Sequence, residues 1–165
     1  MNTMESKFVV SQSKARSAER KRAFVLPSST LICVDVSSPM HRLADVGQIV
    51  DTADVVWFDG TSCTAALRRL NELHSTADLV MFVTANRSWA EFAMAPTARG
   101  KRLATMAEEW TLFRARNRRA RLVLIDLQAQ GMTRAPGHPE VLQIGGFSDA
   151  MLRVVSLFAA GKLDV

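Results

Sequence analysis

Residues 30–40 read TLICVDVSSPM, the stretch that says most about the fold. An apolar run ends at Asp35, Ser37 follows two positions later, and no Gly-rich phosphate loop comes after them. In an open α/β sheet, ligands gather at the carboxyl ends of the strands. The stretch therefore predicts a buried strand whose end presents a carboxylate and a hydroxyl, two oxygen donors of the kind that hard cations prefer.

From residue 28 onward, strand-like and helix-like patterns alternate along the chain. Near-continuous apolar, β-branched runs predict strands over residues 31–36, 54–58, 78–84, 122–127 and 141–144. Apolar residues at helical spacing predict helices that begin after Thr61 and that cover residues 101–117 and 148–160, the last with Met151, Val154, Val155 and Phe158 facing inward. A short helix fits residues 42–50. The alternation predicts one α/β domain, with a Rossmann-like, mainly parallel central sheet flanked by helices in three layers.

The first 27 residues differ in composition from the rest of the chain. Lys and Arg stand there among Ser, Gln and Ala, a mixture too polar to form a core. We therefore expect a basic, flexible arm over residues 1–27 and the α/β domain over residues 28–165. The whole chain has 165 residues and a net charge of +5, which suits an anionic partner without requiring one.

Apolar runs in this sequence are too short to span a bilayer, which takes roughly 20 residues. The basic start has no apolar segment beside it, so no secretory signal is predicted. We expect a cytoplasmic protein without a membrane partner. Cys33 and Cys63 lack C-x-x-C spacing, so we interpret them as reduced, structural residues.

Three stretches lie at the carboxyl ends of predicted strands: Asp35-Val36-Ser37, Asp59-Gly60-Thr61 and Thr84-Ala85-Asn86. Strand ends of a doubly wound sheet can meet in one crevice, where Asp35, Ser37, Asp59 and Thr61 would supply oxygens for Mg²⁺ or Mn²⁺. The alternative is structural, because Asp and Ser commonly cap turns and helices after strands.

An enzymatic interpretation also exists for this chain. Residues 57–61, WFDGT, look like part of the nucleophile loop of haloacid-dehalogenase phosphohydrolases. That pattern needs two aspartates one residue apart, and Trp57 stands at the position of the nucleophilic one. The stretch after Asp35 fails in a similar way, because Ser37 replaces the second aspartate. A Mg²⁺-dependent phosphohydrolase that uses Asp35 or Asp59 is therefore the alternative, and we expect a protein that is not an enzyme.

Longer stretches carry a more specific resemblance. The segment CVDVSSPM, residues 33–40, resembles the Asp-x-Ser-x-Ser opening of the metal-ion-dependent adhesion site in von Willebrand factor A (vWA) domains. Residues 59–89, from DGTSC to ANRSW, and residues 108–161, with the turn GGFSD, are similar to the vWA domain of bacterial Ro ribonucleoproteins, the TROVE family. The similarity covers residues 28–161 in an ordered series.

The resemblance implies a divalent-cation site with Asp35, Ser37 and Thr61 among its donors. Pro39 stands where the family has its second serine, and Ala85 stands where it has a later aspartate. Mg²⁺ makes up for missing ligands by keeping more waters, so the resemblance implies a weak or optional ion.

The resemblance also bears on partners. Asp59 stands where the family commonly has glycine, so it either supplies a further metal ligand or caps the turn. The helical-repeat ring that encircles RNA in the family is missing from this chain. What remains implies a shortened vWA-like binding module that engages a protein or ribonucleoprotein partner at the strand-end face. We expect no small-molecule substrate.

A dense basic segment, RARNRRAR, occupies residues 114–121. It includes Arg114, Arg116, Arg118, Arg119 and Arg121, at a predicted helix end and in the turn to the next strand. Cations at a helix carboxyl end offset its dipole, which is the structural interpretation. The alternative is a phosphate-binding patch for direct RNA binding, without base stacking because no aromatic residues lie among the arginines.

Overall fold

The computed structural model describes residues 9–11, 26–27, 29–35, 54–58, 63–84, 97–98, 101–102, 104–127, 138–146 and 148–163. One sheet holds β1 (Val9–Ser11), β2 (Thr30–Asp35), β3 (Asp54–Phe58), β4 (Leu79–Thr84), β7 (Arg121–Asp126) and β8 (Val141–Gly145). The helices are α2 (Cys63–Glu72), α4 (Met106–Arg116) and α5 (Asp149–Ala159). A separate pair of short antiparallel strands joins β5 (Thr97–Ala98) to β6 (Lys101–Arg102).

The strand order of the main sheet is β1-β3-β2-β4-β7-β8. Neighbouring strands from β3 to β8 pair in parallel, and β1 alone pairs antiparallel, along β3. Parallel neighbours require crossover connections, and α2 and α4 supply two of them on one face of the sheet, from β3 to β4 and from β4 to β7. The predicted α/β class and mainly parallel sheet are confirmed.

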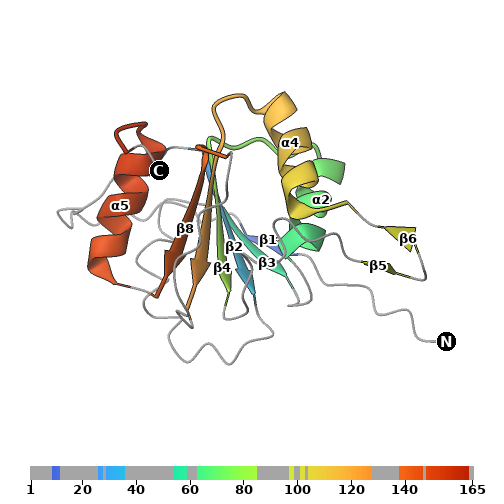
Figure 1. Ribbon diagram of the computed structural model, residues 1–165, viewed down its shortest axis with the longest axis horizontal. Coiled ribbons are helices and arrows are strands. Elements are labelled where there is room, and N and C mark those ends of the chain that lie inside the picture. Colours follow the sequence, from blue (N-terminus) through green and yellow to red (C-terminus); the bar gives the residue numbers. More distant parts are fainter. Residues whose placement is uncertain are drawn as a thin grey trace.

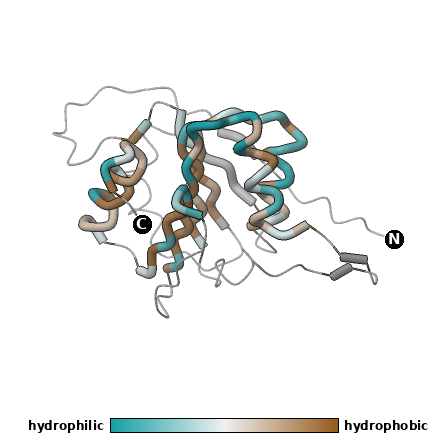
Figure 2. Tube along the Cα trace, turned by 45° about the horizontal axis from the view of Figure 1, so that its top comes forward, coloured by the Kyte–Doolittle hydropathy of each residue, from teal (hydrophilic) through white to brown (hydrophobic). Residues whose placement is uncertain are grey.

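Helices cover the two faces of the sheet unequally. Figure 1 shows α2 and α4 on one face and α5 on the other. The buried cluster beneath α2 and α4 includes Phe82, Trp110 and Phe113, whereas the cluster beneath α5 includes Met81 and Phe158. In Figure 2 the strands at the centre are largely apolar, and polar residues colour much of α2 and α4. This arrangement is the predicted three-layer sandwich.

Two helix details differ from the prediction. α4 begins at Met106, not at residue 101, because Thr105 forms a capping box with Glu108: its Oγ1 accepts from Glu108 N (3.1 Å) and Glu108 Oε2 accepts from Thr105 N (2.7 Å). Residues 101–102 form strand β6 instead. In α5 the prediction that Val154 faces inward is wrong, since this side chain is 38% exposed while Val155 is buried.

Strand β1 was not predicted. Residues 9–11 lie in the segment interpreted as a basic arm, yet they pair with residues 55–57 of β3 at one side of the sheet. Three residues are too few for a recognisable alternation in sequence. The short helix predicted over residues 42–50 lies outside the described residues, as does the rest of the segment up to residue 25.

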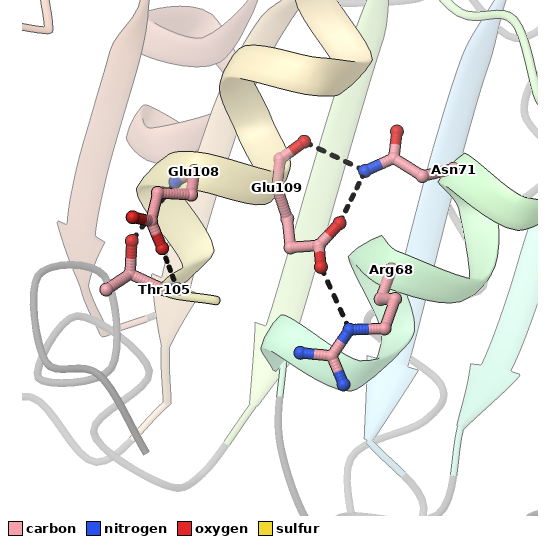
Figure 3. A network of polar contacts seen from close by, with 5 residues as sticks. All are labelled: Arg68, Asn71, Thr105, Glu108 and Glu109. Atoms are coloured by element: carbon pink, nitrogen blue, oxygen red, sulfur yellow. Dashed lines mark hydrogen bonds and ion pairs between the residues drawn. The ribbon is translucent and has the colours of Figure 1, made fainter. Parts of the chain in front are cut away.

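A polar network joins α2 to α4 on the outer side of the sandwich (Figure 3). The buried Glu109 carboxylate accepts from Arg68 Nε (2.9 Å) and from Asn71 Nδ2 (2.8 Å). Asn71 Nδ2 also donates to the Glu109 carbonyl (2.9 Å), and Asn71 Oδ1 accepts from Arg116 (2.7 Å). Because buried carboxylates are costly unless they are paired, this network determines how the two helices lie against each other.

Candidate functional site

The switch point of the sheet lies between β2 and β4. From β2 the chain continues to β3 on one side, and through α2 it returns to β4 on the other side. Ligands of open α/β sheets bind outside the carboxyl ends of strands at such a reversal. Here the two strands end at Asp35 and Thr84, so the edge singled out from the sequence is the edge that the topology favours.

Thr84 and Asp126 form the described part of this edge. The two residues are register partners at the ends of β4 and β7, and they are only 2% and 6% exposed. Thr84 follows Phe82 by two positions, and Asp126 follows Leu124 by two positions. Phe82 and Leu124 pack beneath α2 and α4, and residues two apart in a strand point to the same face, so Thr84 and Asp126 lie on that face of the sheet. A buried hydroxyl and a buried carboxylate therefore lie side by side next to the switch point.

Thr84 was predicted from the sequence to lie at this edge, whereas Asp126 was not. The signal was present, because RLVLID ends an apolar strand with aspartate just as TLICVD does. It was missed because no serine or threonine follows Asp126 at the spacing that marked the other strand ends. The pairing of β4 with β7, and not the local spacing of residues, brings Asp126 beside Thr84.

Helix α2 begins at the same edge. Thr64, in its first turn, is buried, and its hydroxyl makes no hydrogen bond to the part of the chain that the structure describes. The first amides of a helix carry partial positive charge, and α4 also begins at this edge, after its Thr105 cap. Both helices run antiparallel to the strands, so their amino ends point toward the edge at which β4 and β7 end.

The predicted metal donors are only partly described. Asp35 is the last residue of β2, with its backbone paired to Phe58 of β3. Ser37, Asp59 and Thr61 lie outside the described residues, as do Pro39 and Ala85, so the predicted cation site stays a prediction. Within the described ranges, no group of three His, Cys, Asp or Glu side chains is arranged to hold a metal ion.

Cys33 and Cys63 are both buried thiols, as interpreted from their spacing. Burial raises the pKa of the Cys33 thiol far above its ordinary value, because the thiolate would lose its hydration. Only the thiolate is a strong nucleophile, so Cys33 is an inert core residue.

The predicted basic segment lies at the opposite edge of the sheet. α4 ends at Arg116 and β7 begins at Arg121, so the turn between them lies at the amino ends of the parallel strands. In Figure 1 this turn is at the top, whereas the arrowheads of the strands point downward. The two sites predicted from the sequence are therefore separated by the full length of the strands.

Two of the five arginines are held by neighbouring elements. Arg114 forms an ion pair with Glu140, before β8, at 3.2 Å. It also donates to the Arg118 carbonyl (3.3 Å). Arg116 donates to Asn71 of α2 (2.7 Å) and to the Leu112 carbonyl (3.3 Å). These two side chains follow the structural interpretation, since they satisfy carbonyls and pair across elements.

The other three arginines are less constrained. Arg121 lies over the ring of Phe158 in α5, with its Cζ 4.9 Å from the ring centroid. Arg118 and Arg119 are exposed in the turn, and neither side chain forms an ion pair or hydrogen bond with the described residues. Whether any of the five contacts RNA stays a prediction.

Comparisons with known proteins identify a fold. No family model matches this sequence, and no curated protein matches it at a significant level. Among solved structures, the chain is similar to the crystal structure of the Deinococcus radiodurans Ro (RSR) protein, with a TM-score of 0.60 and 15% sequence identity. The match covers 82% of this chain and 35% of that one, so this chain spans about a third of its length. The similarity shows that this chain shares an α/β fold with part of that protein.

None of the helices in the described ranges is long and apolar enough to cross a membrane.

Proposed function

We propose that this chain is a non-enzymatic binding module, related to the vWA domains of Ro ribonucleoproteins, that engages a protein or ribonucleoprotein partner at the carboxyl edge of its sheet. The observation that carries the proposal is the switch point between β2 and β4, with buried Thr84 and Asp126 next to it. The fold shared with the Ro (RSR) protein supports it. A divalent cation held by Asp35, Ser37 and Thr61 is an optional part of the proposal.

A capture experiment tests the module. The immobilised full chain is incubated with extract of its source cells, and the retained proteins and RNAs are quantified for wild type, Asp35→Asn and Asp126→Asn. We expect one partner to be lost from both variants and retained by Arg69→Gln, a substitution on the last turn of α2 at the other edge. Thermal melts confirm that each variant is folded. A partner retained equally by all variants would contradict the proposed edge.

Calorimetry tests the cation. Mg²⁺ and Mn²⁺ are titrated into wild type and into Ser37→Ala. Heat of binding that disappears in the variant would support the cation site, and a flat trace for wild type would remove the ion from the proposal while leaving the protein-binding edge intact.

A turnover assay tests the non-enzymatic part. The protein is incubated with Mg²⁺ and a chromogenic phosphate ester, alongside Asp35→Ala and Asp59→Ala. We expect no hydrolysis above the rate in buffer, because no nucleophile with a neighbouring acid-base group is recognised in the sequence. Turnover that either substitution abolishes would favour the phosphohydrolase alternative instead.

A further inference from the structure

The amino edge of the sheet carries cations that the fold does not use. Arg118 and Arg119 occupy the turn between α4 and β7, and their side chains are exposed. Arginines at the end of a helix can be explained as partners of its last carbonyls. In the last turn of α4, Arg116 already serves that purpose by donating to the Leu112 carbonyl, and Arg114 donates to the Arg118 carbonyl in the turn that follows. Arg118 and Arg119 need another explanation.

The end of α5 brings further cations to the same edge. The Arg121 guanidinium stacks on Phe158 and reaches the end of α5, because a Cβ built on Gly161 would lie 3.3 Å from Arg121 Nη2. The next residue, Lys162, is exposed. We name Arg118, Arg119, Arg121 and Lys162 the amino-edge patch; none of the four forms an ion pair with the described residues.

The described acids near the amino-edge patch do not balance the positive charge of its four side chains. Glu72 pairs with Arg69 at 3.0 Å and Glu140 pairs with Arg114 at 3.2 Å, so both are already engaged. Asp78 is the remaining described acid beside the turn, where its backbone carbonyl accepts from Arg121 N at 2.9 Å. Among the described residues, four cations thus lie at the same edge as one unengaged carboxylate, which leaves an excess of positive charge there.

We propose that the amino-edge patch binds the phosphate backbone of a nucleic acid strand. Guanidinium groups present a planar fork of donors that matches phosphate oxygens, and three of the four cations are arginines. The large apolar side chains exposed in the described residues are all aliphatic: Leu73, Leu112, Val154 and Leu157. Because the described residues expose no aromatic ring on which a base could stack, we expect contacts to phosphates that are independent of sequence.

This site is independent of the proposed function, because it lies at the other edge of the sheet and uses none of the same residues. Figure 2 shows that the connection between α4 and the sheet is strongly hydrophilic. A nucleic acid strand could therefore bind along the amino edge of the sheet while a protein partner binds at the carboxyl edge.

Fluorescence anisotropy tests the proposal with the full chain and fluorescein-labelled oligouridylate, titrated between about 50 and 200 mM salt. Each phosphate contact on a single strand contributes about 0.7 to the slope of log affinity against log salt. We expect the double variant Arg118→Gln, Arg119→Gln to reduce that slope by about 1.4 relative to wild type. The comparison isolates the turn, since the basic residues near the N-terminus are the same in both proteins.

The matched control is Arg153→Gln, at an exposed position of α5 outside the patch, compared with the single variants Arg118→Gln and Arg119→Gln, each of which removes the same charge. We expect the control to retain the wild-type slope and Asp78→Asn to tighten binding. An equal slope for wild type and the turn variant, or an equal loss in the control, would overturn the proposal.

Oligothymidylate should bind as tightly as oligouridylate does, and a strong preference for one of the two would overturn binding through the phosphate backbone alone. Phosphatidylserine vesicles form the last arm: binding to them that depends on Arg118 and Arg119, without oligonucleotide binding, would overturn the nucleic-acid proposal.

Discussion

At the carboxyl edge of the sheet Thr84 and Asp126 are buried side by side, whereas at the amino edge Arg118 and Arg119 extend into solvent. The difference follows from what surrounds each edge. α2 and α4 both begin at the carboxyl edge and place buried residues over it, while the α4–β7 turn projects from the other edge. A buried polar edge suits a specific partner in one orientation, and an exposed charged edge suits a polyanion in many orientations.

The largest effect is expected at Glu109, which connects α2 to the helix that ends at the amino edge. Glu109→Ala leaves Arg68 and Asn71 without their shared partner and should cost about 2–3 kcal/mol, less than a fully buried pair because Arg68 is partly solvated. Urea denaturation measures the loss. Glu72→Ala is the control, because Glu72 is 54% exposed and its pair with Arg69 should be worth less than about 1 kcal/mol. Equal losses of unfolding free energy in the two variants would mean that the hydrogen bonds of Glu109 do not stabilise the packing of α2 against α4.

A smaller difference in stability is expected between substitutions of two threonines, Thr105 and Thr64. Thr105→Ala removes the cap of α4 and should cost about 1 kcal/mol. Thr64→Val should cost nothing, or stabilise by up to about 1 kcal/mol, because it removes a buried hydroxyl that has no partner. Denaturant midpoints of the two variants, measured against wild type, test the contrast. A loss of stability in Thr64→Val as large as that in Thr105→Ala would show that the Thr64 hydroxyl makes a hydrogen bond in the folded protein.

The smallest effect is a pH dependence at the amino edge. Partial burial acts to raise the pKa of Glu140, but hydrogen bonds from its own backbone amide and from His138, together with the charge of Arg114, hold that pKa below its ordinary value of 4.5. A lowered pKa in the folded state means that the stabilisation is present above pH 4.5 and is lost as the pH falls through the folded pKa. Glu140→Gln should therefore unfold with a shallower acid dependence. Unfolding free energies from urea titrations at several acidic pH values measure it, and parallel curves for the two proteins would contradict it.

Much of the fold could be predicted because its signals are local. Continuous apolar runs located five strands of the sheet to within one or two residues, and polar residues marked where β2 and β4 end. The errors came from competing local signals. The apolar spacing of residues 103–113 extended the predicted helix over 101–105, but the Thr105 capping box starts α4 later. The three residues of β1 are too short to show a period.

The candidate site was only half predictable. The carboxyl edge was identified from Asp35 and Thr84, because strand ends are visible in sequence. Asp126 was missed, since its place beside Thr84 depends on how β7 pairs with β4. Among the arginines, the sequence could not separate Arg114, which pairs with Glu140, from Arg118, whose side chain pairs with none of the described residues.

The sequence by itself determined the elements of this protein, their α/β alternation and the total charge, because periodicity and capping act between residues a few positions apart. Only the tertiary structure decided the strand order, the position of the switch point and the division of the basic segment into held and exposed arginines. Those features depend on contacts between distant residues: Arg68 meets Glu109 41 positions later, and Asn71 meets Arg116 45 positions later. Such pairings form when the chain packs to bury its apolar faces, and packing of that kind leaves no local pattern in sequence.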